Sequence, residues 1–544
     1  MPKNKRIIIS LLLIIGSIIF SLPIVRSGLI TRYGLSFWGA NAHDGLWHLS
    51  LINHLQNPFH IELPIFPGFR LINYHPFYNI LIAFIAFVSK IPSRLLVFQI
   101  FPLISSFIIL YLAYKIATKI TKNYLAGLFF VFLTIFATSF GWLISLLRDG
   151  QLYGESMFWS MQSFSTQINP PYTLSLIFLL LLINETLKKK SNIYLIALIL
   201  FFSPITKAYS IIPIFIIAFF HFLNKKQIKY FFIFSFLSLL LFLKFNASSS
   251  SLIVYKPFWF LHTMVETNDR LYLPKIVSII YALKDSPSFS PKLLIINTFL
   301  LFIFILGNYS WRIFAFLEIK NKKYLPYFLS IIICTLIPLF FVQKGTAWNT
   351  IQFLYYALFL SNLLLTIYIF KNINKALFKI LLSIIIITSI IGNIGNLKNY
   401  LSNPPPTAIS FAEIEALNFL KKQETGIVLT PLYDPYLKKR YDQTPIPIYA
   451  YETTAYVSAL SHQKVFLEDE MNLSIIRDDW QQRKSEIKDF FDQKNAYIDR
   501  NFLLQNNIRY IYLPKIYNFS FDNINMYLNT IFENEEIRII KVKK

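Results

Sequence analysis

Carboxylates and imidazoles gather between long apolar runs of this chain, and their types and spacing could do acid–base chemistry. Asp44 stands at the start of the segment HDGLWHLSLINHL, whose apolar residues recur at helical spacing: Leu46, Leu49, Ile52 and Leu55. The pattern predicts a helix lying on a membrane surface. A helix N-terminus favours a carboxylate, and His48 follows one turn later on the same face. Asp44 is therefore a candidate general base, and the alternative is that it only caps the helix.

Histidines are concentrated in the same segment. Five of the eight lie within residues 26–94: His43, His48, His54, His60 and His75. Together with Asp44 and Glu62 they could hold a divalent cation such as Mg²⁺ or Mn²⁺, because imidazole and carboxylate suit several such ions. No HExxH or similar pairing is present. The sequence therefore requires no cofactor, and histidines at an interface without a metal are the favoured interpretation.

Further polar residues mark the ends of other apolar runs. Asp149 and Glu155 lie in a second segment, 148–171, and Glu266, Asp269 and Arg270 lie in a third, 246–290. A shorter fourth segment, QKGTAWNTIQFLYY, adds Asn349 and Gln352. Polar residues at the lip of an apolar span are a binding-site hypothesis. The alternative is that water-exposed segments simply tolerate carboxylates, and that the aromatic residues there form an interfacial belt.

One lysine lies at a break between two apolar helices. Lys207, in SPITKAYS, follows the Ser203-Pro204 interruption. Irregular backbone at membrane depth is tolerated only where it lines protein or a wet cavity, so Lys207 could hold an anionic headgroup such as a lipid phosphate. The alternative is that its side chain reaches to the outer surface.

Composition shows what kind of element must position these residues. Of the 544 residues 55% are hydrophobic and 15% are charged, with a mean hydropathy of +0.50, which excludes a water-exposed globule. Residues 401–544 hold 19 acidic and 18 basic side chains, whereas residues 1–400 hold 9 and 34. We therefore expect a polytopic transmembrane domain over 1–400, with a long first outer loop at 26–94, and an extracytoplasmic domain over 401–544. The single cysteine, Cys334, excludes a disulfide framework.

Eleven transmembrane helices are predicted. Apolar runs fall near 7–25, 95–117, 124–147, 172–186, 192–204, 207–223, 229–245, 291–311, 324–342, 350–370 and 376–397. The positive-inside rule favours a cytoplasmic N-terminus, with 76–91 lying along the outer surface, because the inner loops then collect the basic residues, Arg312 among them. Seven of the acids of this part then lie outside: Asp44, Glu62, Asp149, Glu155, Glu266, Asp269 and Asp285. The chain is thus expected in the inner or plasma membrane, with no nucleic acid as partner.

The tail reads as a small α/β domain. After the linker Pro404-Pro405-Pro406, a capping box from Ser410 to Glu413 opens a helix that is expected to end near Gln423. Strand signals follow in GIVLT, KVFL, NIRYIYLPK and EIRIIKVKK. The run 468–470 reads as a solvated acidic turn. With no phosphate loop or nucleophile elbow, the tail is expected to bind an acceptor or to cover a membrane site.

The arrangement resembles the GT-C superfamily of multi-pass glycosyltransferases. The likeness rests on Asp44 in NAHDGLWH after the first span, the Tyr74-His75-Pro76 element before a surface helix, an acid-bearing second outer loop and a soluble C-terminal domain. The phrases HDGLWHLSLIN, NYHPFYN, TAWNTIQFLYY and YVSALSHQKVFL resemble a group of uncharacterised bacterial membrane proteins. The tail lacks a WWD-type motif, its only tryptophan being Trp480, so the resemblance does not extend to peptide glycosylation.

The resemblance implies a polyprenyl-phosphate-linked sugar as donor, bound with membrane lipid, and an acceptor outside the membrane. Asp44 would be the base, and Glu155 or Asp149 would supply a second carboxylate. Arg70, Lys207 and Arg270 would stabilise the departing phosphate. His48, His75, Glu266, Asp269, Asn349 and Gln352 would complete the binding surface.

Two other functions remain open at the level of sequence. A transporter or flippase for a lipid or a small solute would place ionisable groups near the bilayer midplane, often in inverted repeats. Here the acids gather in the loops of one face, and no internal repeat is evident, which favours the enzyme. A non-catalytic envelope protein with the same architecture is the third possibility.

Overall fold

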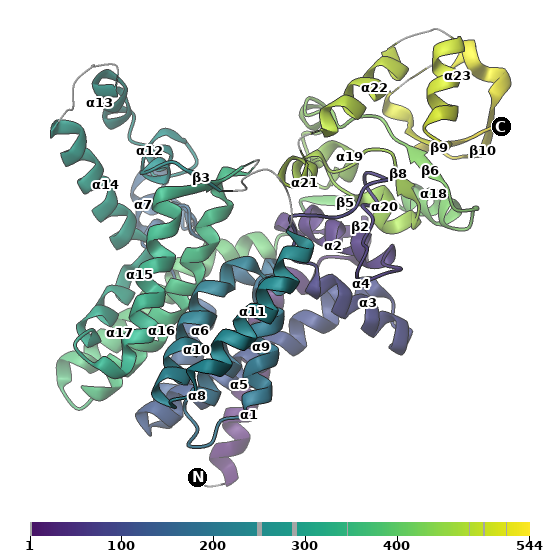
Figure 1. Cartoon of the computed structure of the whole chain (residues 1–544). Coiled ribbons are helices and arrows are strands. Elements are labelled where there is room, and N and C mark those ends of the chain that lie inside the picture. Colours follow the sequence, from purple (N-terminus) through teal and green to yellow (C-terminus); the bar gives the residue numbers. More distant parts are fainter. Residues whose placement is uncertain are drawn as a thin grey trace. The chain divides into compact units, whose positions relative to one another are not determined.

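The chain folds into two compact units, each built from two stretches of sequence (Figure 1). The computed structural model describes residues 3–246, 253–284, 291–344, 346–477, 479–492, 496–517, 519 and 521–543. Unit 1 holds Met1–Pro23 and Leu103–Leu401, and unit 2 holds Ile24–Pro102 and Ser402–Lys544. Parts of the predicted third outer segment, 247–252 and 285–290 with Asp285, lie outside the described residues.

Unit 1 is a helical unit with one small sheet. Its helices are α1 (Lys3–Val25, whose last residues belong to unit 2), α5 (Phe101–Thr121), α6 (Tyr124–Phe136), α7 (Gly141–Asp149), α8 (Pro170–Thr186), α9 (Ile193–Thr206), α10 (Ile211–Asn224), α11 (Ile228–Phe245), α12 (Trp259–Glu266), α13 (Pro274–Lys284), α14 (Pro291–Tyr309), α15 (Leu325–Phe340), α16 (Gln352–Lys371) and α17 (Ala376–Tyr400). Strands β3 (Ile253–Tyr255) and β4 (Phe341–Gln343) pair antiparallel.

Several helices are long and apolar enough to cross a membrane. Within the described ranges these are seven: Lys3–Val25, Ser93–Thr121, Ile228–Phe245, Pro291–Glu318, Lys322–Phe340, Ala347–Lys371 and Ala376–Tyr400. The pair α6 and α7, bent by 47°, is an eighth candidate. The remaining predicted spans coincide with the shorter apolar helices α8, α9 and α10. The chain is thus an integral membrane protein, while the count of eleven spans and the orientation stay predictions.

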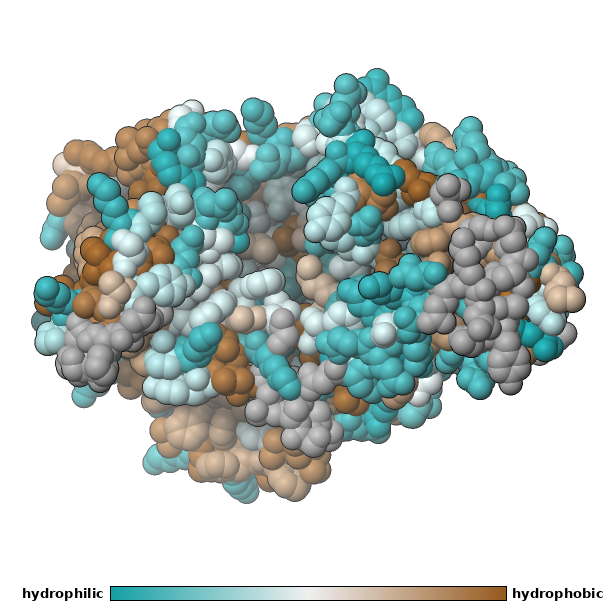
Figure 2. Space-filling model, turned by 90° about the horizontal axis from the view of Figure 1, so that it is seen from above, coloured by the Kyte–Doolittle hydropathy of each residue, from teal (hydrophilic) through white to brown (hydrophobic). Residues whose placement is uncertain are grey.

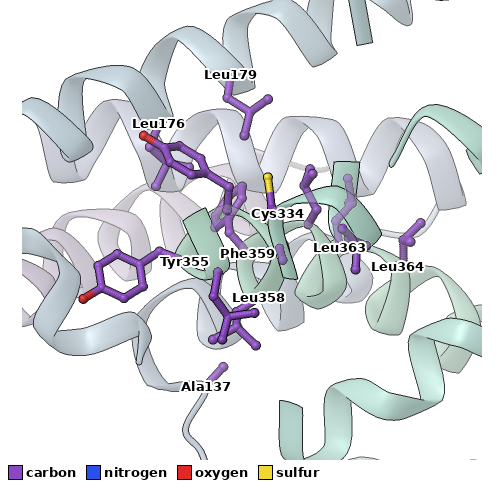
Figure 3. Close-up of a cluster of buried hydrophobic side chains, with 14 of the residues drawn as sticks. Ala137, Leu176, Leu179, Cys334, Tyr355, Leu358, Phe359, Leu363 and Leu364 are labelled. Carbon is purple, nitrogen blue, oxygen red and sulfur yellow. The ribbon is translucent and has the colours of Figure 1, made fainter. Parts of the chain in front are cut away.

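The core of unit 1 forms around α16. Almost every residue of this helix is buried, as expected of a helix that is apolar on all sides. Figure 3 shows side chains of α16, among them Leu358 and Phe359, together with Cys334 of α15 and Leu176 of α8. Apolar packing on every face thus places α16 at the centre of the cluster.

The break between α6 and α7 is stabilised by polar side chains. The carbonyl oxygen of Thr138 accepts hydrogen bonds from Ser310 Oγ (2.6 Å) and from Arg312 Nη1 (3.3 Å). Arg312 was expected in a cytoplasmic loop, and this prediction was wrong. It lies 1% exposed in the 3₁₀ segment η5 (Ser310–Glu318), which continues α14. A carbonyl group that a helix break leaves unpaired in apolar surroundings needs a hydrogen-bond donor. The distribution of basic residues between loops does not reveal this need.

The described residues of unit 2 form two sheets, and several of their strands are labelled in Figure 1. The larger has the strand order β10 (Leu528–Glu533), β11 (Ile537–Val542), β9 (Ile508–Pro514), β6 (Ile427–Leu429) and β8 (Lys464–Val465). Strand β6 pairs parallel with β8 and β9, and β11 pairs antiparallel with β9 and β10. The face of unit 2 seen at right in Figure 2 is largely hydrophilic, in keeping with the balanced charge of the tail.

The helices of unit 2 come from both of its stretches. They are α2 (Asp44–Asn53), α3 (Phe77–Ser89), α4 (Ser93–Leu95), α18 (Phe411–Lys421), α19 (Ile448–Tyr451), α20 (Tyr456–Ser461), α21 (Glu470–Ile476), α22 (Trp480–Asp492) and α23 (Ala496–Gln505). The predicted surface segment 76–91 is α3, an apolar helix of 13 residues with Pro76 at its N-cap. Ser410 Oγ caps α18 by accepting from Glu413 N (3.0 Å). Glu413 does not complete the box: its Oε1 accepts from Tyr512 Oη (3.0 Å).

The second sheet joins the first predicted outer loop to the tail. Its order is β1 (Leu29–Thr31), β2 (Gly34–Phe37), β5 (Thr407–Ile409) and β7 (Ile446–Pro447). Strand β2 pairs antiparallel with β5, with Leu35 opposite Ile409. Gly34 has φ +97°, and a Cβ there would lie 2.0 Å from the carbonyl oxygen of Ile409. Glycine is therefore needed where the two strands meet.

This pairing divides the chain differently from the predicted domains 1–400 and 401–544. The segment 24–102 packs with the tail rather than with the helices that follow it. Helix α2, expected on a membrane surface, is instead buried from Gly45 to Ile52. The apolar spacing correctly predicted a helix here. Its second face is covered by α20 of the tail, and hydropathy alone does not reveal this contact.

Candidate functional site

The carboxylate of Asp44 is one end of a three-residue relay in unit 2. Its Oδ1 lies 2.8 Å from Nδ1 of His43, and Nε2 of His43 lies 2.8 Å from Oδ1 of Asp469. The side chain of Asp44 is 41% exposed, whereas those of His43 and Asp469 are 6% and 0% exposed. A buried carboxylate thus orients an imidazole, and the imidazole orients a carboxylate that reaches solvent.

Two helix N-termini fix this geometry. His43 is the N-cap of α2 without a side-chain capping bond, and Asp44 is the first helical residue. Asp44 therefore does not fill the capping position that the alternative interpretation gave it. Asp469 caps α21 from the left-handed region (φ 52°), and its carboxylate accepts from Asn472 N (3.1 Å) and Nδ2 (2.7 Å). These bonds fix the orientation of the Asp469 carboxylate, whose Oδ1 also lies next to His43.

Two neighbouring carboxylates favour the charged form of the His43 imidazole. Burial by itself lowers the pKa of His43, but the carboxylates of Asp469 and Asp44 outweigh burial, and the pKa stands well above its usual value of 6.5. Both ring nitrogens then donate, one to each carboxylate. A charge-assisted bond on each side makes the relay rigid.

The acidic run that contains Asp469 is not a solvated turn, and that prediction was wrong. Glu468 is 7% exposed and Asp469 is 1% exposed. The Glu468 carboxylate accepts from the backbone amides of Val457 (3.0 Å) and Ser458 (3.1 Å), at the start of α20. Burial raises the pKa of Glu468 to about 8. Charge patterning predicted solvation because sequence does not show which turns a neighbouring element covers.

His48 and His75 lie on the same stretch but outside the relay. His48 is 5% exposed and lies 3.1 Å, by Nδ1, from Asn79 Nδ2. His75 stacks on Tyr74 at 4.8 Å, and Tyr74 Oη accepts from Trp47 Nε1 (2.9 Å). These rings pack α2 against the start of α3.

Arg70 and Glu62 face each other across an isolated β-bridge. Arg70 Nη2 donates to the carbonyl oxygen of Phe59 (3.3 Å). Glu62 pairs with Lys464 of the tail (2.6 Å). Arg70 remains a candidate for binding the donor phosphate from unit 2. The ion pair of Glu62 with Lys464 joins the first loop to the tail.

No metal cluster is found among the residues that the structure describes, where no three His, Cys, Asp or Glu side chains could hold an ion. His43 uses both ring nitrogens on carboxylates. His54 Nδ1 instead meets the carbonyl oxygen of Ser50 (2.9 Å). Four of the five histidines of the loop, His43, His48, His54 and His75, thus have side-chain contacts with different partners.

The other predicted carboxylates belong to unit 1. Asp149 binds Arg148, with Nε to Oδ1 at 2.8 Å, and also Tyr153, at an exposed position. Glu155 is partly buried and accepts from the backbone amide of Gln162. Burial raises the pKa of Glu155 to about 7. The two carboxylates have different partners, and no contact of the described residues joins them.

A buried polar centre, formed by Gln162, Arg312 and Asn362, was not predicted from the sequence; the backbone amide of Gln162 joins it to Glu155. Gln162 Oε1 accepts from Arg312 Nη1 (2.9 Å), and Arg312 Nε donates to Asn362 Oδ1 (2.7 Å). A buried guanidinium needs such partners. The signal in the sequence was weak: Arg312 is one basic residue beyond an apolar run, and Asn362 is one amide within another.

The predicted third segment forms a separate group in unit 1. Arg270 Nη1 donates to Ser156 Oγ (2.9 Å), and its guanidinium lies 4.5 Å from the ring centre of Trp159. Asp269 lies 3.5 Å from Arg270 Nη2. Glu266 Oε1 accepts from Tyr281 Oη (3.2 Å). Arg270 thus lies next to the segment that contains Glu155, while Glu266 has a different partner.

Lys207, Asn349 and Gln352 are brought together. Lys207 Nζ donates to Asn169 Oδ1 (3.3 Å), Asn169 Nδ2 to Gln352 Oε1 (3.4 Å), and Gln352 Nε2 to Asn349 Oδ1 (3.3 Å). Lys207 is 3% exposed and lies over the ring of Tyr209 at 5.1 Å. Its side chain is therefore buried in unit 1 and does not reach out to a surface.

The structure thus presents a relay in unit 2, Asp44–His43–Asp469, and two polar groups in unit 1, around Arg312 and around Lys207. The sequence singled out Asp44 but missed His43 and Asp469 as its partners. The adjacency of His43 and Asp44 was a usable signal. Nothing local pointed to Asp469, which lies 426 positions from His43.

Comparisons with known proteins give only weak structural likenesses. No family model matches the chain, and no curated protein matches its sequence. The Archaeoglobus fulgidus oligosaccharyltransferase in complex with Zn and sulfate is 13% identical, with a TM-score of 0.49 over 95% of this chain and 71% of that chain. The apo form gives 12%, 0.47, 95% and 72%. The same organism's AglB, in complex with an inhibitory peptide and a dolichol-phosphate, gives 11%, 0.44, 94% and 70%. Likenesses at these scores assign neither a fold nor an activity to this chain.

Proposed function

We propose that this chain is a membrane glycosyltransferase that moves a sugar from a polyprenyl-phosphate-linked donor to an acceptor outside the membrane. The observation that carries the proposal is the relay in which buried Asp469 and His43 orient the exposed carboxylate of Asp44. A carboxylate held in one position next to solvent suits a general base. The apolar helices of unit 1 supply a surface for the prenyl chain.

The reaction follows from these groups. Asp44 takes the proton of the acceptor hydroxyl through the oxygen that does not face His43. The bond from the acceptor oxygen to the anomeric carbon forms while the bond from that carbon to the phosphate oxygen breaks. The polyprenyl phosphate leaves with the electron pair, and a cation stabilises its developing charge. Arg70, Lys207 and Arg270 are the candidates for this cation, and Glu155 or Asp149 for a second carboxylate.

Location follows from the same proposal. We place the N-terminus in the cytoplasm and the tail outside the cell membrane, because the inner loops then carry the basic residues. The acceptor and the lipid-linked sugar donor then meet at the outer side of the membrane, where membrane lipid is also present. Nucleic acid has no part in this function.

Sugar transfer by the purified full-length chain in proteoliposomes tests the proposal. We expect Asp44→Asn to lower turnover about 100-fold or more, the usual size of a general-base effect. Glu486→Gln makes the same carboxyl-to-amide change at a partly exposed position of α22 and should leave turnover unchanged. Wild-type turnover in Asp44→Asn would remove Asp44 as the base. Donor binding without transfer by the wild type would instead identify a non-catalytic envelope protein.

A lipid or solute transporter is the second candidate. The observation that favours it is the buried guanidinium of Arg312 within an apolar helix, since intramembrane ionisable groups often mark transport paths. A flipping assay with a fluorescent polyprenyl phosphate in the same proteoliposomes separates the two. Transport by the wild type that Asp44→Asn leaves intact, without sugar transfer in either protein, would favour the transporter.

A further inference from the structure

A pocket opens in the tail part of unit 2, next to the buried end of the relay. Its wall includes Asp469, the residue that holds His43, together with the neighbouring Glu468 and Glu470. All residues that line it come from the range 430–517. The pocket therefore belongs wholly to one compact unit and shares one side chain, Asp469, with the relay that orients Asp44.

The wall of the pocket is acidic and aromatic. Besides the three acids at 468–470 it contains Glu452, and tyrosine rings close its sides, among them Tyr433, Tyr449 and Tyr517. Among the described residues that line it there is no lysine, arginine or histidine. Such a wall repels phosphate and sulfate, so the phosphate of a lipid-linked donor does not fit there. Carboxylates and electron-rich ring faces both attract a cation.

Among the described residues, the four carboxylates differ in how their charge is balanced. Asp469 is paired with His43, and Glu470 Oε2 lies 2.7 Å from Lys484 Nζ. Glu468 is buried, and its raised pKa keeps it protonated near neutral pH. Glu452 has no ion pair among the described residues. Burial raises the pKa of Glu452 above its usual value; the charge of His43 acts against this, whereas those of Asp44 and Asp469 add to it. A positive charge in the pocket would offset the free-energy cost of burying the ionised Glu452 carboxylate.

Two buried oxygen atoms of the wall also lack a partner. Thr454 is 5% exposed, and its Oγ1 has no hydrogen-bond partner within the described part of the chain. Oε1 of Glu470 is likewise buried without a partner there. Unpaired buried acceptors are uncommon and call for an explanation. A ligand that donates hydrogen bonds and carries a positive charge satisfies both of them.

We propose that this pocket binds the ammonium group of a ligand, with Glu452 as its counter-charge, Thr454 Oγ1 and Glu470 Oε1 as hydrogen-bond acceptors, and tyrosine rings as the walls. Ammonium groups are commonly recognised in this way, by aromatic faces together with a carboxylate. The three N–H groups of a primary ammonium match the number of acceptors that the wall provides.

The site lies beside the relay, so the ligand that carries this ammonium group is taken to be the sugar acceptor. That second step rests on the proposed function, whereas the binding of an ammonium group stands on the pocket alone. The acceptor class would then be an amine-bearing molecule, such as an amino sugar.

Equilibrium binding to the full-length chain in detergent tests the pocket without any transfer reaction. The probes are glucosamine and glucose, which differ by an ammonium group in place of a hydroxyl group. We expect glucosamine to bind about tenfold more tightly, the size expected for one charged hydrogen-bonded contact. Equal binding of the two sugars overturns the proposal, and this comparison needs no variant.

Variants then locate the binding. Glu452→Gln removes the counter-charge and should abolish the preference for glucosamine, while Thr454→Val, which keeps the shape, should weaken glucosamine about threefold, a fraction of the tenfold contact. Glu415→Gln on the exposed side of α18 makes the matched change outside the pocket and should bind as the wild type. An unchanged preference in Glu452→Gln contradicts the site. Selective binding of glucosamine without any sugar transfer would retain the pocket and reject the proposed function.

Discussion

The side-chain oxygens of Ser50 and Ser458 lie 2.8 Å apart, although 408 positions separate them in the sequence. Asn53 Nδ2 adds a bond to the carbonyl oxygen of Ala459 (2.8 Å). These bonds join α2 of the first loop to α20 of the tail, and small side chains let the helices approach closely. The tail therefore holds the candidate base at the start of α2 in place, and substitutions in the tail should alter the position of this base.

The first prediction concerns the charge of His43. Asp469→Asn removes one of the two carboxylates that hold the pKa of His43 well above 6.5, so this pKa should fall by about one unit or more. NMR titration of histidine-labelled full-length chain measures it, and Asp442→Asn, in an exposed loop, is the matched control. Sugar transfer should fall as well, because Asp44 loses its fixed orientation. A His43 pKa that does not move would mean that Asp469 does not hold the imidazole.

The second prediction concerns the dependence of stability on pH. Glu468 has a pKa of about 8 in the folded chain and 4.5 as its ordinary value. Between these values the folded chain binds more protons than the unfolded one, so stability falls as the pH rises from 4.5 to 8.

Glu468→Gln should remove this part of the slope. The apparent melting temperature of the wild type should fall by about 4 °C more between pH 5 and pH 9 than that of the variant. Thermal unfolding of both proteins in the same detergent measures the difference. Parallel curves would show that Glu468 is ionised in the folded chain.

The third prediction concerns the strand pair that joins loop and tail. Gly34→Ala places a methyl group 2.0 Å from the carbonyl oxygen of Ile409, at φ +97°, so β2 and β5 must separate. Gly68→Ala is the control, with a similar φ of +87° but nothing within 4 Å of its Cβ. The control should lose about 1 kcal/mol of stability through backbone strain, and Gly34→Ala should lose clearly more. Limited proteolysis near residue 402 compares them, and equal sensitivity would contradict the pairing.

The fourth prediction concerns the buried polar centre of unit 1. Arg312→Met removes the donor to Asn362, Gln162 and Thr138, and leaving buried acceptors unpaired costs about 1–3 kcal/mol for each. The melting temperature and the yield of folded protein in detergent should both fall. Lys320→Met, at an exposed position, should change neither. A variant as stable as the wild type would show that water takes over the contacts of the guanidinium.

Much of the fold was predictable because its signals are local. The runs that form α11, α16 and α17 were located from hydropathy alone, since about 20 consecutive apolar residues require a bilayer or a core. The strands β6, β9 and β11 followed from β-branched and aromatic runs. Hydropathy did not predict the break after α6. It also did not predict that Arg312 donates a hydrogen bond to the carbonyl group freed at this break, because an unpaired carbonyl group does not change the composition of the sequence.

The sequence by itself determined that the chain is largely apolar, that its acids gather in a few segments, and that Asp44 begins a helix. Only the tertiary structure decided that β2 pairs with β5, that α2 is covered on both sides, and that Asp469 reaches His43. The reason is physical: apolar periodicity depends on near neighbours in the chain, whereas the pairing of a buried carboxylate depends on which distant turn excludes water from it.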